Sequence, residues 1–156
     1  MKVEHLLVID MQTGFMADKV TPQERSATLV INSLEARARR LGIPVTYSVQ
    51  SSDKYGFLIP QMNPASPDEI VDTQYNDAFT SPVFADRVNQ SGPLAICGRN
   101  LEFCVLATAV SAVQNGYHTW VVKDAVISRD RDSFLKWLSK IYFSVERDIT
   151  YSNFKD

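Results

Sequence analysis

Cys104 and Asp10 each combine a chemically reactive side chain with a position just beyond a predicted strand, where reactive side chains often serve catalysis or binding. Cys104 comes six residues after Gly98, which ends the apolar segment Pro93–Cys97, and it falls in the first turn of a predicted helix. Unpaired backbone N–H groups and the positive end of the helix dipole favour a thiolate there. Asp10 ends another apolar segment, His5–Ile9, where a carboxylate is costly unless something needs it. The sequence therefore predicts a cysteine nucleophile at 104 and a functional carboxylate at 10.

Each of these residues also has a structural interpretation. Free cysteine is among the most buried residue types, so Cys104 and Cys97 could both be small core residues. Asp10 could be a helix cap or a turn former. A third interpretation makes Cys104 a redox sensor with Cys97 as its resolving partner, which requires the two sulfurs within bonding reach.

The elements that must position these residues alternate between strand and helix. Thr21 is expected to cap a helix that begins with Pro22, carries Glu24 in its first turn and stops at Gly42. Short apolar runs predict strands at 5–9, 44–49, 70–73, 93–97, 118–122 and 148–151, and helices are predicted at 82–89, 101–115 and 130–142. Such alternation predicts a three-layer α/β/α sandwich around a mostly parallel, six-stranded sheet. Ligands of such sheets bind at the carboxyl ends of the strands.

Composition limits the class of protein and its partners. The 156 residues are 45% hydrophobic and 22% charged, as expected for one globular domain over residues 1–156. A net charge of -2 without a basic block speaks against nucleic acid or an anionic membrane as a partner. No apolar run is long enough to cross a bilayer and no signal peptide is evident, so we expect a cytoplasmic protein with free thiols.

Several short motifs together resemble one enzyme family. They are Leu7-Val8-Ile9-Asp10-Met11-Gln12 with Phe15, Gly98 followed by Cys104-Val105 and Thr108-Ala109, Ala112 with Gly116-Tyr117, and Val121 to Ala125. In order and spacing the chain resembles the isochorismatase-like cysteine hydrolases. The resemblance implies a small-molecule substrate, no cofactor and a homo-oligomer.

The resemblance also implies roles for particular residues. Hydrolytic members of the family use an Asp, a Lys and a Cys, and Asp10 and Cys104 match the first and the last. The Asp takes the thiol proton, and the Cys attacks an amide carbon. Backbone N–H groups near a non-proline cis peptide stabilise the oxyanion, which places that cis bond in the turn with Arg99 and Asn100.

The family lysine is missing from this sequence. Thr73 stands where the lysine is expected, and a hydroxyl cannot supply its positive charge. Lys54 from the long loop, or Arg99 beside the turn, could supply charge instead. The Asp-x-His pair of metal-binding relatives is absent after the second strand, so no metal is expected. The two histidines, His5 and His118, both open strands and are expected to be surface or strand-edge residues.

Two functions remain open at the sequence level. Phe15, Phe79, Phe103 and Tyr55 could line a pocket or belong to the core. The first hypothesis is a cysteine hydrolase that cleaves a C–N bond of a small amide. The alternative is a catalytically impaired relative that binds a small molecule. Without an opposing charge, the pKa of Asp10 is predicted to rise, unless Lys54 reaches it.

Overall fold

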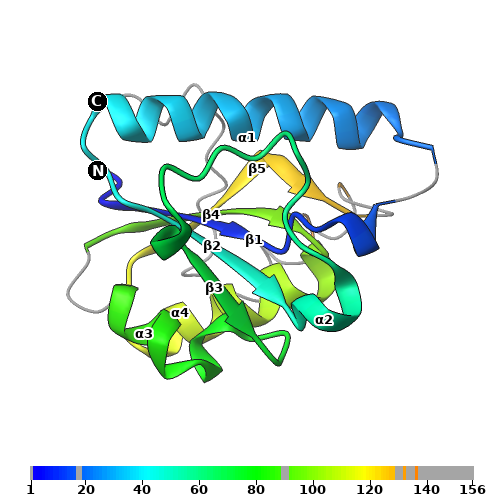
Figure 1. Ribbon diagram of the computed structural model, residues 1–156. Helices are drawn as coiled ribbons and strands as arrows, with labels where there is room; N and C mark the ends of the chain where they lie inside the picture. The colour runs from blue at the N-terminus through cyan, green and yellow to red at the C-terminus, as the bar shows by residue number, and fades with distance from the viewer. Residues whose placement is uncertain (1, 17–18, 89–91, 129–131, 133–135, 137–156) are drawn as a thin grey trace.

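The computed structural model describes residues 2–16, 19–88, 92–128, 132 and 136. The sheet has five described strands, all parallel, in the order β3-β2-β1-β4-β5 (Figure 1). They are β1 (His5–Ile9), β2 (Val45–Gln50), β3 (Ile70–Thr73), β4 (Leu94–Arg99) and β5 (Thr119–Ile127). The α/β fold with a parallel sheet is confirmed, and the predicted strand at 148–151 lies outside the described residues.

Helices cover both faces of this sheet. One long helix, α1 (Pro22–Arg40), lies along one face, and α3 (Pro82–Val88) and α4 (Leu106–Gln114) lie on the other (Figure 1). The short α2 (Ser52–Tyr55) follows β2. Each face buries its own apolar cluster, because parallel strands with helices on both sides need apolar residues on both faces.

The N-terminus of α1 is fixed by a reciprocal cap. The Thr21 hydroxyl accepts a 3.1 Å hydrogen bond from the Glu24 backbone N–H, and the Glu24 carboxylate accepts one of 2.8 Å from the Thr21 N–H. Pro22 occupies the first helical position, where no N–H is required. The helix therefore begins where the sequence predicted. No helix in the described part of the chain has both the length and the apolar composition to span a bilayer.

Two helix and strand predictions needed correction. The helix predicted at 101–115 opens with a π-helical turn, Leu101–Val105, and becomes α-helical at Leu106. The fifth strand does not stop at Val122 but continues to Ile127, because a shift in register after Ile96 lets Gly98 pair with Val126. The helix predicted at 130–142 falls almost wholly outside the described residues.

Register brings the carboxyl ends of three central strands together. Ile9, the last residue of β1, pairs with Ser48 of β2 on one side and with Gly98 of β4 on the other. On the outer side of β2, Gln50 pairs with Thr73. The residue after β1 is therefore flanked by the ends of β2 and β4.

Candidate active site

Asp10 lies at the centre of this carboxyl edge. Its side chain is buried and its backbone is left-handed, with φ of 48°. The backbone N–H donates to the Ser48 carbonyl at 3.1 Å, and the Ser48 hydroxyl donates to Oδ1 of Asp10 at 2.7 Å. The end of β2 thus holds both the backbone and the carboxylate of Asp10.

The turn after β4 carries Cys104 toward this carboxylate. Gly98 has φ of 122°, and a Cβ there would lie 2.1 Å from the Ile9 carbonyl oxygen, so only glycine allows β4 to approach β1 so closely. Asn100 is also left-handed, with φ of 63°. The described residues contain no cis peptide bond, so the expected cis bond at residues 98–100 is wrong. The chain turns there through the positive φ angles of Gly98 and Asn100 instead.

Asp10 and Cys104 are close enough to alter each other's titration. Burial raises the pKa of Asp10, and the negative charge of Asp72 raises it further, while hydrogen bonds from Ser48 and Cys104 partly offset the rise. This direction agrees with the prediction from sequence. Burial also raises the pKa of the Cys104 thiol, and so do the charge of Asp10 and the hydrogen bond to it.

The predicted lowering of the Cys104 pKa is therefore contradicted. The groups that lower it, the Asn100 side chain and the Cys104 backbone N–H, are outweighed by burial and by Asp10. Both pKa values are thus raised, and a carboxylate of raised pKa is an acceptor better matched to a thiol proton than an ordinary aspartate.

The position of the missing lysine holds no substitute cation. Thr73 is buried, and its hydroxyl donates to the Val49 carbonyl at 3.4 Å. No Lys or Arg in the described ranges lies within 4.0 Å of the Asp10 carboxylate. Lys54 is exposed, with Nζ 4.8 Å from the centre of the Tyr55 ring, so it does not reach Asp10.

Arg99 is used for a different contact. Its guanidinium forms an ion pair with Glu24 at the start of α1 and donates to Sδ of Met16 at 3.0 Å. Glu24 also takes part in the reciprocal cap with Thr21, so this ion pair connects the end of β4 to the first turn of α1. Arg99 therefore anchors the turn and does not supply charge to Asp10.

Two carboxamides surround the Cys104 sulfur on the remaining side. Sγ lies 3.3 Å from Oε1 of Gln50 and 3.6 Å from Oδ1 of Asn76. Nε2 of Gln50 in turn donates to Oδ1 of Asn76 at 3.2 Å. The sequence analysis gave neither residue this role. Gln50 is the last residue of β2 and Asp10 directly follows β1, so their shared place at the carboxyl ends of the strands could have indicated Gln50 as a site residue.

The predicted pocket aromatics divide between a groove and the core. Phe15 and Phe103 line a groove of about 1180 Å³ between the start of α1 and the turn that follows β4. Arg99 and Asn100 lie in the same wall of that groove. Phe79 is partly buried and packs on Phe84 and Tyr117 at the border of the apolar cluster on the α4 face, so its place in a pocket stays a prediction.

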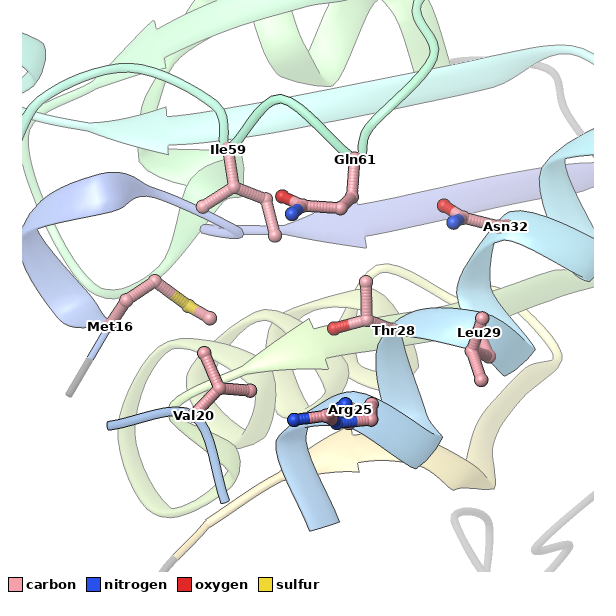
Figure 2. Close-up of a pocket in the computed structure, with 8 residues that line it drawn as sticks. All are labelled: Met16, Val20, Arg25, Thr28, Leu29, Asn32, Ile59 and Gln61. Atoms are coloured by element: carbon pink, nitrogen blue, oxygen red, sulfur yellow. The ribbon is translucent and has the colours of Figure 1, made fainter. Parts of the chain in front are cut away.

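A smaller hollow adjoins this groove. It measures about 320 Å³ and lies between the first half of α1 and residues 59–61 (Figure 2). Met16 contributes to both hollows. Four of the residues that line it in Figure 2 are apolar and the others are Arg25, Thr28, Asn32 and Gln61, so it adds no cysteine, histidine or carboxylate to the site.

The other cysteine and the histidines do not join the site. Cys97 packs in the apolar cluster on the α1 face and Cys104 in the cluster on the α4 face, so the sheet separates the two free thiols and the redox interpretation fails. His5 was expected at the surface or a strand edge; it opens β1 as predicted but is buried, with Nε2 2.9 Å from the Thr46 hydroxyl, and burial lowers its pKa to about 4. His118 packs edge-on against Trp120. Among the described residues no group of three or more His, Cys, Asp or Glu is placed to hold a metal ion.

Comparison with known proteins places this geometry in one family. Residues 4–138 match the isochorismatase domain model. Over 140 residues the chain is 26% identical to a streptothricin hydrolase of Streptomyces noursei, covering 82% of this chain and 56% of that protein. The chain thus spans little more than half the length of that relative.

Solved structures agree on the fold. The N-carbamoylsarcosine amidase of Thermoplasma acidophilum superposes with a TM-score of 0.78 at 21% identity, over 96% of both chains. An isochorismatase family protein of Desulfovibrio vulgaris gives a TM-score of 0.83 at 18% identity, over 97% of this chain and 95% of its own. At these identities the likeness shows the fold, and the chemistry must be argued from the site.

Proposed function

Because the chain belongs to the isochorismatase family, we propose that it is a cysteine hydrolase that cleaves a C–N bond of a small amide-type substrate. Cys104 is the nucleophile and Asp10 the base. One observation carries the proposal: a thiol and a carboxylate of raised pKa face each other at the carboxyl edge of a parallel sheet. Ligands of open α/β sheets bind at this edge.

The chemistry uses Asp10 twice. The thiol proton of Cys104 passes to Asp10 while Sγ forms a bond to the amide carbon, and the carbonyl π electrons move to oxygen. As the tetrahedral intermediate collapses, the C–N bond breaks and the leaving nitrogen takes the proton from Asp10. Water, deprotonated by Asp10, then attacks the thioester, which releases the acid and returns the proton to sulfur.

The turn after β4 supplies the groups expected to stabilise the oxyanion. The Cys104 backbone N–H already points at the sulfur and lowers the pKa of the thiol. We assign the backbone N–H groups of Asn100 and Cys104 to the oxyanion, since N–H donors fixed in a poorly solvated site stabilise developing charge most effectively. The groove beside this turn gives a small substrate a partly aromatic wall.

Two of the similar proteins carry names that agree with this chemistry. One is a hydrolase and the other an amidase. They support hydrolysis at a C–N bond as the reaction class. The identity of the amide is a separate question that a substrate panel answers.

One observation favours a second function. No described cation faces Asp10 to oppose the rise that burial causes in its pKa, and a carboxyl group of raised pKa is ionised, and able to act as a base, over a narrower pH range. The alternative is therefore a catalytically impaired family member that binds a small molecule in the same groove.

Turnover assays with variants separate the two functions. Purified protein is incubated with a panel of small primary amides, N-carbamoyl compounds and ureido acids, and ammonia release is followed. Cys104→Ala and Asp10→Asn should each abolish release, whereas Cys97→Ala, which alters a thiol on the other face of the sheet, should retain it. Mass spectrometry of quenched reactions should find an acyl adduct on Cys104. Saturable binding of a panel compound without release or adduct would establish the binding protein instead.

We also propose that the chain forms a homo-oligomer in solution. Several large apolar side chains are exposed on the described surface, among them Leu29 and Val20 beside the smaller hollow. Contiguous exposed apolar groups are typical of interaction surfaces.

A further inference from the structure

The two carboxamides beside Cys104 stand where the site lacks a cation. Oε1 of Gln50 and Oδ1 of Asn76 both face Sγ, at 3.3 and 3.6 Å. In this orientation both groups present an acceptor to the single S–H proton, for which Asp10 is a further acceptor, and this arrangement suits a thiol that carries its proton. Oxygen atoms facing a thiolate would repel it.

The hydrogen-bond pattern of the pair can be reversed without being broken. Gln50 donates through Nε2 to Oδ1 of Asn76 at 3.2 Å. A carboxamide has an acceptor and a donor of nearly the same shape, and a half turn about its last carbon–carbon bond exchanges them. If both groups turn together, Nδ2 of Asn76 donates to Oε1 of Gln50, and each group presents an N–H to Sγ.

The surroundings of the pair leave the two head groups able to turn. The backbone of Gln50 is fixed by Gln12, which accepts from its N–H at 2.7 Å and donates to its carbonyl at 3.0 Å. Gln12 is itself fully buried and also donates to the Gly56 carbonyl at 2.7 Å. The Gln50 side chain is only half-buried, and Asn76 is exposed. The backbone is therefore held while the carboxamides are not.

We propose that Gln50 and Asn76 are catalytic residues that replace the family cation by turning from acceptors of the thiol to donors to the thiolate. When the Cys104 S–H bond breaks, the proton goes to Asp10 and the electron pair stays on Sγ. Rotation of the two carboxamides moves no proton. This inference rests on the proposed function, because a stabilised thiolate serves the hydrolase reaction, but its test measures the titration of Cys104 without substrate.

The sign of one measurement distinguishes the proposal from a fixed arrangement. If the carboxamides only accept, they stabilise the thiol, and removing them shifts the titration of Cys104 to lower pH. If they donate to the thiolate, removing them shifts it to higher pH. Hydrogen bonds to charged groups contribute about 1.5–3 kcal/mol, which corresponds to a change of about tenfold or more in the thiolate fraction.

The experiment follows the pH dependence of alkylation of Cys104 by iodoacetamide in the full chain, with mass spectrometry to assign the site. The ultraviolet absorbance of the thiolate over the same pH range gives a second readout that does not depend on access of the reagent. Gln50→Ala and Asn76→Ala should each move the midpoint upward and lower the thiolate fraction at pH 8 about tenfold. Asn115→Ala, which removes an exposed carboxamide that donates to the Ser111 carbonyl at the far end of α4, is the matched control and should leave the midpoint unchanged.

A second pair of variants tests replacement of charge directly. In the Asn76→Ala background, Thr73→Lys should restore the midpoint at least in part, because an ammonium group then does the work of the lost donor. Thermal unfolding of each variant confirms that the fold is retained. An unchanged or lowered midpoint in both alanine variants overturns the proposal.

No substrate enters this measurement, so its result is separate from that of the turnover assay. Absent hydrolysis with an upward midpoint would reject the proposed hydrolase and keep the role of the carboxamides in thiolate stabilisation. Hydrolysis with an unmoved midpoint would support the proposed hydrolase and reject the role of the carboxamides in thiolate stabilisation.

Discussion

The hydroxyl of Ser48 donates a 2.7 Å hydrogen bond to Oδ1 of Asp10, and the two residues sit at the ends of neighbouring strands. This bond lowers the pKa of Asp10, whereas burial, the larger effect, raises it. The Ser48 hydrogen bond thus positions the Asp10 carboxylate but only partly offsets the cost of burying its charge. A charge kept under such conditions reduces the stability of the fold.

Asp10→Asn should therefore stabilise the protein at neutral and alkaline pH while abolishing turnover. The folded pKa of Asp10 lies above its ordinary 3.8, so the native state binds more protons than the unfolded state between the two values. Stability of the wild type then falls as pH rises from 3.8 through the folded pKa. Asparagine does not titrate and tolerates a left-handed backbone. Urea unfolding at several pH values should show a gap between variant and wild type that widens with pH; a gap that is constant with pH would contradict this account.

Thr73→Lys should increase the activity of the site. An ammonium group near Asp10 and Cys104 favours the charged form of both and lowers the pH at which the thiol reacts. We expect alkylation of Cys104 at neutral pH to accelerate on the order of tenfold, and ammonia release to stay equal or rise. A loss of turnover in a variant that remains folded would show that position 73 does not correspond to the family lysine.

Glu24→Gln should destabilise the junction between α1 and β4. Glutamine keeps the hydrogen bond to the Thr21 N–H but leaves the partly buried Arg99 guanidinium without a countercharge, at a cost of about 1.5–3 kcal/mol. Its control is Thr21→Ala, which removes only the cap and should cost about 1 kcal/mol.

The pH dependence of this junction follows from the same ion pair. Hydrogen bonds from Thr21 and Arg99, and the charge of Arg99, hold the pKa of Glu24 below its ordinary 4.5 against the opposing effect of burial. Its contribution is present above pH 4.5 and is lost as pH falls through the folded pKa. The difference in denaturant midpoint between wild type and Glu24→Gln should narrow progressively as pH falls from 7 to below 4.5; a difference that does not change with pH would refute the role of the pair.

Gly98→Ala should disrupt the site through the backbone. A methyl group there meets the Ile9 carbonyl oxygen at 2.1 Å, and φ of 122° is strained for any side chain. The matched control is Gly42→Ala, also at positive φ but with nothing within 4 Å. We expect a loss of about 1–2 kcal/mol for the control and more than about 4 kcal/mol at position 98, measured by urea unfolding. Equal losses would mean that the close approach of β4 to β1 is not required.

The oligomeric state can be measured directly. Gel filtration coupled to light scattering should give a multiple of 17.6 kDa. A monodisperse mass of 17.6 kDa at micromolar concentration would exclude the homo-oligomer.

The strand ends could be predicted from sequence because a parallel sheet leaves a plain signal. Segments buried on both faces read as short apolar runs, and the polar residue after such a run marks the carboxyl edge. That reasoning placed Asp10 and Cys104 on one edge and predicted a raised pKa for Asp10, and the structure agrees. It also gave the start of α1, since Thr21, Pro22 and Glu24 form a local pattern.

What failed depends on contacts between distant segments. The direction of the Cys104 pKa is set by burial and by Asp10, 94 residues earlier, and these outweigh the local effect of the helix start. Gln50 and Asn76 are 26 residues apart, and nothing in either motif indicates that their carboxamides meet. His5 opens a strand, yet it is buried because Thr46 of the neighbouring strand lies opposite its ring.

The sheet between Cys97 and Cys104 also gives the molecule two internal probes of its own opening. Cys97 is fully buried in the apolar cluster beneath α1, with Sγ 3.5 Å from the Leu7 carbonyl, so a reagent reaches it only when α1 leaves the sheet and the core on that face opens. Cys104 sits one turn beyond the strand and becomes accessible when that turn alone opens. Protection of the first thiol therefore reports global unfolding, and protection of the second reports a smaller, local excursion of the edge where the chemistry is proposed. The ratio of the two protection factors gives the difference in free energy between opening the core and opening that edge alone.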